Sequence, residues 1–309
     1  MRRNGTQEYK FSIITINFNG FKDTCALIDS IPYSDDVEIV VVDNASRQDE
    51  ASMLEQRYPH VMVVRSSQNL GFAGGNNLGI GAAHGQYLFF VNNDTEFSQG
   101  EWQQVERLIQ RLEDNPEVAA VCPKIRFFWG DHPIQFAGYT PLSTVTMRNR
   151  SIGFGEADRG QYDTPHATPY VHGAAMMVRR DAIERAGLMP ECYFLYFEEL
   201  DWSMMLRRAG YDLWYDPACT ILHKESQTTG QSSPLRTYYL ARNRLLFARR
   251  NVPAPRRYLT YLYLMTVVCL RDVGKNVLQR RFSLAKAALS GMTAFFRGEQ
   301  GYHEFAIER

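Results

Sequence analysis

The first 125 residues show a regular alternation of apolar and polar stretches. Largely apolar runs lie at residues 11–16, 37–42, 61–64 and 87–91, and stretches with helical spacing separate them. Short apolar runs of this kind are typical of strands buried on both faces, and strands that alternate with helices indicate a parallel sheet with right-handed crossovers. The pattern predicts an α/β fold for this half of the chain.

The second half of the chain has a less regular pattern. A helix is predicted from residue 99 to about 113 and a strand over 118–123, and the stretch 125–168 is expected to form irregular strands and loops. The remaining elements are expected, in chain order, as a strand at 170–178, a helix at 181–186, a strand at 192–197, a helix at 198–209 that Gly210 ends, and strands at 211–215 and 221–223.

The apolar run 87–91 stops abruptly at two amides and a carboxylate, those of Asn92, Asn93 and Asp94. Ligands of open α/β sheets bind beyond the carboxyl ends of the strands, so these side chains are expected to face a site. A carboxylate there can hold a hard divalent cation, and the cation can hold a diphosphate. The alternative is a turn in which Asn and Asp bond their own backbone.

A second predicted strand ends at the carboxylate of Asp43, and the first strand ends at Asn17 and Phe18. A carboxylate at this place can accept the N3–H group of uracil or thymine, which would make it part of a nucleotide site. Asp43, Asn44 and Ser46 are also common helix N-cap residues, so a purely structural role is the alternative.

Residues 69–79 are rich in glycine and asparagine, among them Asn69, Gly71, Gly75 and Asn76, and are expected to form a loop that runs into a helix. The stretch is neither G-x-G-x-x-G nor a Walker sequence. Its glycines would still allow the backbone to approach a ligand, and the N-terminus of a helix favours anions. A tight turn that needs positive φ is the structural alternative.

Three acids, Glu198, Glu199 and Asp201, crowd the start of the predicted helix 198–209. Acids at this end of a helix are favourable against the helix dipole, so capping is one explanation. Glu198 and Asp201 are three residues apart and share a face, whereas Glu199 points elsewhere. One of the three is therefore expected to face a cleft, where a carboxylate could deprotonate an attacking hydroxyl.

His223 closes a short strand and could join Asp94 on a divalent metal as a neutral imidazole, although a lone histidine is more often structural. Several aromatic side chains nearby could stack on a sugar, and at these spacings they are more often part of the core. They are Tyr193, Tyr196, Trp202 and Trp214.

The composition of the whole chain limits which partners and which cellular compartment are expected. Its 309 residues hold 34 basic and 34 acidic residues, which gives no global case for nucleic acid as a partner. Five scattered cysteines form no C-x-x-C pair, which favours a reducing cytosolic compartment over a disulfide framework or a zinc knuckle. The first ten residues are polar and unlike a signal peptide, and no apolar run reaches the roughly 20 residues that span a bilayer.

The charge is unevenly distributed, because residues 236–297 hold thirteen basic side chains and a single acid, Asp272. Apolar and aromatic residues lie between them, notably over 258–270, as in amphipathic helices that lie in a membrane interface. Each Lys or Arg near an anionic leaflet adds about 1 kcal/mol of attraction. The alternatives are a helical cap on the rest of the protein, an oligomer interface, or a nucleic-acid surface, for which no known motif is present.

Five stretches together resemble a known family. They are Ile16–Gly20, Val41–Ser46, Asn69–Asn76, Phe90–Asp94, and His172–Ala174 with Glu198–Asp201. In this order they resemble the family-2 glycosyltransferases of the GT-A fold, most of all the bacterial rhamnosyltransferases that build surface polysaccharides. The resemblance covers roughly residues 10–225. It implies a catalytic domain over 1–230, with a donor half at about 10–123 and an acceptor half at about 124–230, followed by a basic helical region over 231–309.

The resemblance also implies roles for single residues. Glu199 matches the catalytic base, and Asp94 the last acid of the metal motif, while Asn92 stands where the family has a first acid. Asp94 and His223 are thus the expected metal ligands, and Arg242-Asn243-Arg244 matches a stretch of unassigned role. The expected donor-binding residues are Asn17, Phe18, Asp43, Asn44, Ser46, Asn69, Gly71, Gly75, Asn76, Asn92, Asn93 and Asp94. The expected acceptor-positioning residues are His172, Gly173, Glu198, Asp201 and Trp202.

The implied activity is an inverting glycosyl transfer that depends on Mg²⁺ or Mn²⁺. The expected donor is dTDP-rhamnose, with UDP-linked GlcNAc, Gal or Glc as the alternative, and the expected acceptor is a glycan or an undecaprenyl-diphosphate-linked sugar. The enzyme is expected at the cytoplasmic face of the cell membrane. A nucleotidyltransferase and a non-catalytic nucleotide-sugar-binding module are the alternatives from other classes.

Overall fold

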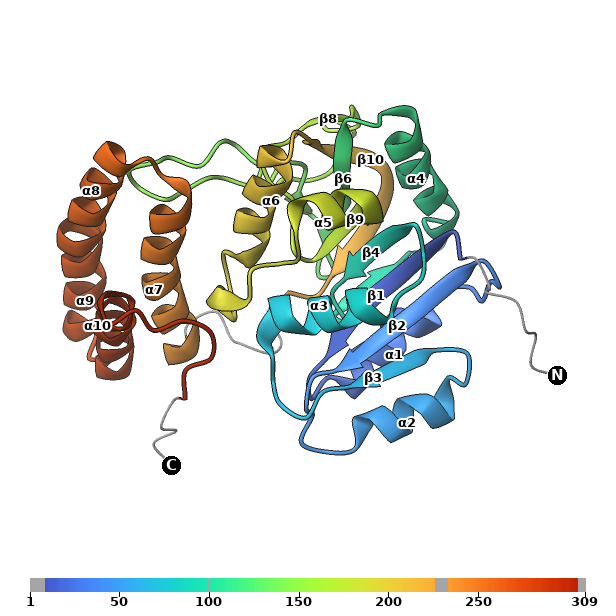
Figure 1. Ribbon diagram of the computed structural model, residues 1–309, viewed down its shortest axis with the longest axis horizontal. Helices are drawn as coiled ribbons and strands as arrows, with labels where there is room; N and C mark the ends of the chain where they lie inside the picture. The colour runs from blue at the N-terminus through green and yellow to red at the C-terminus, as the bar shows by residue number, and fades with distance from the viewer. Residues whose placement is uncertain (1–8, 99, 226–232, 305–309) are drawn as a thin grey trace.

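The structure is a computed structural model that describes residues 9–98, 100–225 and 233–304. The sheet lies at one end of the molecule and a group of C-terminal helices at the other (Figure 1). The strands of the first half are β1 (Phe11–Asn17), β2 (Val37–Asp43), β3 (Met62–Arg65) and β4 (Tyr87–Val91), and the helices between them are α1 (Phe21–Asp29), α2 (Glu50–Arg57) and α3 (Gly71–Ala82).

The first half forms the parallel sheet that its apolar runs predict. Its strand order is β3-β2-β1-β4, and all three pairings are parallel. The register of β1 and β2 sets Asn17 directly opposite Asp43, so the polar ends of both strands meet at one edge of the sheet. Most apolar residues of β1, β2 and β4 are buried, because helices cover them, whereas the edge strand β3 is half-buried to exposed.

The second half adds antiparallel pairs, so the sheet is mixed. Its elements are β5 (Thr95–Phe97), a 3₁₀ turn at Trp102–Gln104, α4 (Val105–Asp114), β6 (Val118–Phe127), β7 (Ile134–Phe136), β8 (His166–Ala167), β9 (Ala175–Arg179), α5 (Arg180–Ala186), a 3₁₀ turn at Glu191–Tyr193, α6 (Glu198–Arg208) and β10 (Asp212–His223). Strand β9 runs antiparallel between β4 and β6, β10 runs parallel to β6, and β5 closes the edge of β10.

Three sequence-based expectations need correction. Residues 192–197 do not form a strand, because Phe194, Tyr196 and Phe197 have left-handed φ angles of 68°, 67° and 79°. The two short strands expected at 211–215 and 221–223 are one strand, β10, with an irregular middle. The glycine-rich loop is mostly helix, since α3 begins at Gly71.

The C-terminal region is helical, as its pattern predicts. It consists of α7 (Pro234–Asn251), α8 (Ala254–Tyr263), a π-helical segment (Leu264–Val268), α9 (Cys269–Leu278) and α10 (Phe282–Phe296). Helix α7 packs against α6 and the turn before it, and α10 packs along α7. Figure 1 shows α8 and α9 on the far side of α7 from the sheet.

Candidate functional site

The turn after β4 brings Asp94 to His223. The backbone oxygen of Asn92 accepts hydrogen bonds from the Thr95 amide at 3.1 Å and the Thr95 hydroxyl at 2.6 Å, which reverses the chain into β5. Because Thr95 is paired with His223 in the β5–β10 ladder, Asp94 lies beside the imidazole. Asp94 Oδ1 is 3.1 Å from His223 Nε2, so the structure brings together the pair expected to bind metal.

The donor set of this pair fits a divalent cation. His223 Nδ1 lies 2.8 Å from Gln135 Oε1, an acceptor that suits a hydrogen on Nδ1, and Nε2 is then the ring nitrogen that would bind a cation beside Asp94. Two ligand atoms at right angles on an octahedral metal, each about 2.1 Å away, lie about 3 Å apart, which matches the pair. Among the described residues no group of three acids, histidines or cysteines forms a metal site, so other ligands would be diphosphate and water.

Asp43 belongs to a buried polar network at the ends of β1 and β2. Asn17 Nδ2 donates to Asp43 Oδ1 at 2.9 Å and to Glu50 Oε2 at 2.8 Å, and the Ser46 hydroxyl donates to Asp43 Oδ1 at 2.6 Å. Asp43 Oδ2 accepts only a long bond of 3.4 Å, from the Ser46 amide, so it keeps capacity for a further donor such as a base N–H.

This network also settles the capping alternative. Helix α2 is capped by Asp49, whose carboxylate accepts from the Ser52 amide at 3.1 Å, so Asp43 is not its N-cap. Glu50 was missed by sequence reasoning, because it lies at the first turn of α2 and only the fold brings it to Asn17. Phe18 follows Asn17 directly and is half-buried.

Several of the expected donor-binding residues form hydrogen bonds or close contacts that stabilise the start of α3. Asn44 Nδ2 donates to Asn69 Oδ1 at 3.1 Å and to the Gly71 oxygen at 3.2 Å, and Asn44 Oδ1 accepts from the Leu70 amide at 2.9 Å. Gly71 has φ +71°, and a Cβ there would lie 2.2 Å from the Phe194 backbone oxygen. Asn44 and Gly71 therefore hold this turn, the structural alternative to the expected donor-binding role.

Two further residues of this stretch face the core. A Cβ on Gly75 would lie 2.8 Å from the Ile16 side chain, so glycine lets α3 approach β1 closely. Asn76 is buried and donates to the Phe72 oxygen one helical turn earlier, at 3.1 Å. Asn93 in contrast lies at the sheet edge and donates to the Thr24 hydroxyl of α1 at 3.1 Å.

The carboxylates of Glu198 and Glu199 lie at the start of α6 with no cation bound to them in the described chain. Glu198 is buried and its Oε2 has no hydrogen-bond partner there. Burial raises the pKa of Glu199 from 4.5 to about 6, and burial together with the charge of Glu199 raises the pKa of Glu198 further. An acid with a pKa near 6 is a competent general base at neutral pH.

A row of side chains connects Glu199 to the Asp94–His223 pair. Burial and then the charge of Glu199 raise the pKa of Tyr139, and the Tyr139 ring stacks on His172 at 13°, with centroids 5.9 Å apart. Burial and then the neighbouring His223 lower the pKa of His172 to about 3, so His172 is neutral and its Nδ1 accepts from the Ala174 amide at 3.1 Å. The stacked pair Tyr139 and His172 therefore has Glu199 among its charged neighbours on one side and His223 on the other.

Gly173 lies in the same wall. A Cβ placed on it would be 3.8 Å from Glu199 Cγ and 3.5 Å from the Phe72 ring, so the glycine forms ordinary contacts and leaves the space beside Glu199 open. The structure thus places His172, Gly173 and Glu199 together, as the sequence predicts, and adds Tyr139, which no sequence motif singled out.

Asp201 lies on the same helix turn but faces away from this site. Its carboxylate is fully buried and accepts from the Tyr193 hydroxyl at 3.0 Å, from Asn251 Nδ2 at 2.8 Å and from the guanidinium of Arg250. Arg208 lies 3.5 Å away on its other oxygen. Asp201 therefore ties α6 to α7, and its carboxylate is occupied by these contacts.

Trp202, also expected to position the acceptor, lies in the core. It is fully buried, its indole donates to the Gly187 oxygen at 2.9 Å, and Phe90 meets it edge-on with centroids 5.6 Å apart.

Arg242 and Asn243 hold the turn that presents Glu199. Arg242 is buried and donates to the Tyr193 oxygen at 2.7 Å, while Asn243 Nδ2 donates to the oxygens of Leu195 at 2.7 Å and Tyr196 at 3.0 Å. Left-handed residues cost of order 1–3 kcal/mol and persist where the surroundings hold them in place. Arg242 and Asn243, from the stretch whose role the resemblance left unassigned, thus stabilise the turn before α6 through hydrogen bonds.

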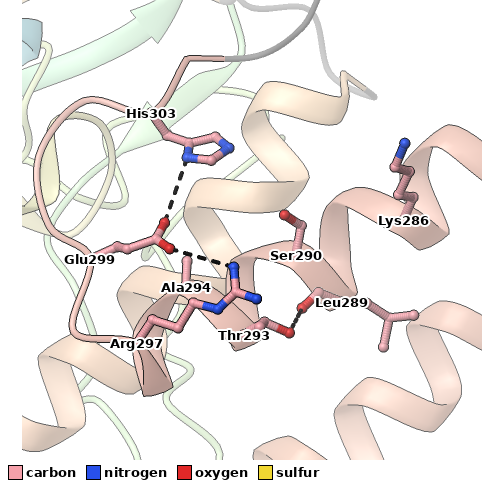
Figure 2. Close-up of a pocket in the computed structure, with 8 residues that line it drawn as sticks. All are labelled: Lys286, Leu289, Ser290, Thr293, Ala294, Arg297, Glu299 and His303. Atoms are coloured by element: carbon pink, nitrogen blue, oxygen red, sulfur yellow. Dashed lines mark hydrogen bonds and ion pairs between the residues drawn. The ribbon is translucent and has the colours of Figure 1, made fainter.

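A separate hollow lies on the C-terminal helices. Figure 2 shows residues that line a pocket of about 500 Å³ on α10 and the segment after it, where Glu299 lies between Arg297 at 3.9 Å and His303 at 3.7 Å. None of the expected catalytic or donor-binding residues lines it.

Comparisons with known proteins agree with this geometry. The family model for glycosyl transferase family 2 matches residues 12–187. A low-salt glycan biosynthesis hexosyltransferase of Haloferax volcanii is 28% identical over 243 residues, which cover 76% of this chain and 74% of the relative. An N-acetylglucosaminyl-diphospho-decaprenol L-rhamnosyltransferase of Mycobacterium tuberculosis is 26% identical over 217 residues, covering 63% and 69%.

Solved structures show the same fold. The structure of GalNAc-T7 with UDP, GalNAc and Mn²⁺ matches with a TM-score of 0.60 and 13% identity, over 89% of this chain and 58% of that chain. The mannosyltransferase PcManGT of Pyrobaculum calidifontis, in complex with GDP-Man and Mn²⁺, matches with a TM-score of 0.55 and 16% identity, over 94% and 76%. The mixed sheet, the polar strand ends that it gathers and the family match lead to one conclusion: the chain belongs to glycosyl transferase family 2 and is an inverting glycosyltransferase of the GT-A fold.

Proposed function

We propose that the chain transfers a sugar from a nucleoside diphosphate to an acceptor hydroxyl, with Glu199 as the general base. The observation that carries this proposal is the raised pKa of Glu199, in a site that the His172–Tyr139 stack joins to the Asp94–His223 pair. Glu199 takes the proton of the acceptor hydroxyl as that oxygen forms its bond to the anomeric carbon. The bond from this carbon to the diphosphate oxygen breaks on the opposite face, which inverts the configuration.

Asp94 and His223 are the residues that would hold a divalent cation, Mg²⁺ or Mn²⁺. When bound, the cation supplies positive charge to the leaving diphosphate. The support is the 3.1 Å separation of Asp94 Oδ1 and His223 Nε2, and the contact of the other ring nitrogen, Nδ1, with Gln135 Oε1 at 2.8 Å. Removal of divalent ions with EDTA is expected to abolish transfer, and added Mn²⁺ to restore it. Transfer that persists in EDTA would contradict the proposal.

The donor is proposed to be dTDP-rhamnose, with Asp43 Oδ2 accepting the N3–H group of the base beside Phe18. Support comes from the unused capacity of Asp43 and from the rhamnosyltransferase similarity. A UDP-linked hexose fits the same base contact and remains the second candidate, because the hexosyltransferase relative is 28% identical over 76% of this chain, against 26% over 63% for the rhamnosyltransferase. The melting temperature measured with UDP, dTDP, GDP and CDP, with and without Mn²⁺, shows which nucleotide the protein binds. A ligand that binds the native state raises its stability. Stabilisation by GDP alone would contradict the pyrimidine contact.

The acceptor is proposed to be a lipid-linked glycan, which the enzyme reaches at the cytoplasmic face of the membrane through its accessory region 231–309. Within the described residues no helix has the length and apolarity needed to cross a bilayer. Helices α8 to α10 instead expose a set of large apolar side chains between basic residues, a pattern typical of interfacial helices. The most exposed are Tyr258, Leu259, Leu262, Leu270, Leu278, Phe282 and Phe296.

Helix α7 is too deeply packed for a truncation to test this contact, because Tyr238, Tyr239 and Leu245 are fully buried. We therefore expect the double variant Leu262→Glu, Leu270→Glu to lose flotation with phosphatidylglycerol vesicles. Leu188→Glu, an exposed site near α5, is the matched control and is expected to float like the wild type. Equal flotation of all three would remove the membrane contact and favour an oligomer interface, which sedimentation of the same variants measures.

A further inference from the structure

Three segments of the chain bring Arg148, Arg236 and Arg271 near enough to Arg244 for their charges to act on it. Arg236 and Arg244 are eight residues apart on α7 and so share a face. Arg148 belongs to the segment 139–151, whose ends are bridged at Tyr139 and Ser151, and Arg271 belongs to α9. Met147, next to Arg148, packs in one cluster with α7 residues and with the π-helical segment before α9, which holds these parts together.

Arg244 is the centre of this group, which we call the arginine cluster (Arg148, Arg236, Arg244 and Arg271). Burial lowers the pKa of Arg244, and the charges of Arg148, Arg271 and Arg236 lower it further against the opposing effect of Asp272. Asp272 forms its ion pair with Arg271, at 2.6 Å. Several like charges that act on one guanidinium favour an anion beside it.

Two buried hydrogen-bond donors in this part of the chain lack an acceptor among the described residues. They are Nε of Arg244 and Nδ2 of Asn149, the residue after Arg148. A buried donor without an acceptor costs about 1–3 kcal/mol, so orphan donors beside excess positive charge mark a place for acceptor oxygens. Phosphate oxygens fit arginine best, because they take parallel N–H bonds from one guanidinium.

The arginine cluster lies between Glu199 and the exposed apolar helices. The Arg236 guanidinium lies 5.9 Å from the ring centroid of Tyr196, three residues before Glu199. The segment with Arg148 at its far end begins at Tyr139, which responds to the charge of Glu199. On the other side, Arg271 follows Leu270, whose side chain is 72% exposed. The donor diphosphate is assigned to the opposite end, at Asp94 and His223.

We propose that the arginine cluster, with Arg244 at its centre, binds the diphosphate of an isoprenoid-linked acceptor and so holds the acceptor sugar at Glu199. This inference rests on the proposed function and adds the group by which the acceptor is recognised. The order of features along the molecule matches the order along such an acceptor, with hydroxyl at Glu199, diphosphate at the arginines and apolar chain at the exposed face of α8 and α9. The same chemistry could also come from an anionic lipid headgroup, which the experiment separates.

The test measures binding of farnesyl diphosphate, an isoprenoid diphosphate that stays in solution, to the full-length protein by calorimetry. Arg148→Gln and Arg244→Gln are each expected to raise its Kd at least tenfold. Arg256→Gln, an exposed arginine of α8 outside the cluster, is the matched control and is expected to stay within twofold. Farnesol, which lacks the diphosphate, is expected to show no dependence on these arginines. Because Arg148 is exposed, its variant is expected to fold even where Arg244→Gln does not.

Two results would overturn the proposal. One is equal binding of farnesyl diphosphate by the wild type and by Arg148→Gln. The other is a loss confined to flotation with phosphatidylglycerol vesicles, which would assign the arginines to membrane headgroups. Failure of the proposed function gives a different result, because nucleotides with Mn²⁺ would then stabilise neither the wild type nor the variants. The farnesyl diphosphate measurement would still show whether the arginines bind a diphosphate.

Discussion

Glu199 and Asp201 are acids two residues apart on the first turn of α6, yet their surroundings differ completely. Asp201 is fully buried and is bound by Tyr193, Asn251 and Arg250. Glu199 has no ion pair in the described chain, and burial raises its pKa to about 6. A paired carboxylate holds the structure together, whereas an unpaired carboxylate keeps its affinity for a proton, which a base needs.

Helix geometry explains the difference. Residues two apart in a helix point about 200° from each other, so one acid faces α7 and the other faces the sheet edge. Helix α7 supplies Arg250 and Asn251 to one side only. The following predictions test whether pairing separates a structural acid from a catalytic one.

The largest effect is expected for Glu199→Gln, which keeps the size of the side chain and removes the base. The turnover number is expected to fall by about 10²- to 10⁴-fold, the usual contribution of general base catalysis. Nucleotide-sugar affinity, measured by calorimetry, is expected to stay within twofold, because Glu199 acts on the acceptor. Unchanged turnover would remove Glu199 from the mechanism.

Asp201→Asn is expected to act on stability. The change leaves the guanidinium of Arg250 without its carboxylate, and loss of one partner of a buried pair costs about 3–5 kcal/mol. Because the Arg250 side chain is 38% exposed, we expect a smaller loss of about 2–3 kcal/mol in the free energy of unfolding, measured in urea. Asp212→Asn, at an exposed position, is the control and should change little. Equal stability of both variants would show that pairing does not matter at Asp201.

Glu199→Gln is expected to change stability in the opposite direction. The folded protein holds the proton of Glu199 with a pKa of about 6, above the ordinary 4.5, so stability falls as pH rises from about 4.5 to about 6 and stays lower above that. Glutamine removes this cost and is expected to stabilise the protein by about 1–2 kcal/mol at pH 8, with little effect at pH 4. Glu184→Gln, exposed on α5, is the control. Destabilisation at pH 8 would mean that Glu199 is paired after all.

The smallest effect is expected in the pH profile of the wild type. Only the ionised form of Glu199 accepts a proton, so kcat/KM is expected to rise about tenfold between pH 5 and pH 7, with a midpoint near 6. Initial rates at subsaturating acceptor measure it. A midpoint of the kcat/KM profile near pH 4.5 would mean that the base has the pKa of a carboxylate in water, not that of a buried one.

The sequence was informative where local chemistry and strand order decide the outcome. Apolar runs that end in Asn17, Asp43 and Asp94 predicted parallel strands and polar groups at their carboxyl ends, because a buried strand allows few polar residues before it ends. The pairing of Asp94 with His223 was also predicted, although it depends on β5 and β10 being neighbours.

Tertiary structure alone decided the rest. Residues 192–197 have the aromatic composition of a strand, but donors from Arg242 and Asn243 hold them in a left-handed turn, and local preference carries no information about donors some fifty residues away. Helix periodicity sets Glu199 on a different face from Glu198 and Asp201, but all three acids are favourable at a helix start, and the sequence does not show which face meets cations. Only the placement of α7 on one side of α6 gave Asp201 its cations and left Glu199 unpaired, because electrostatic environment depends on which distant segments pack together.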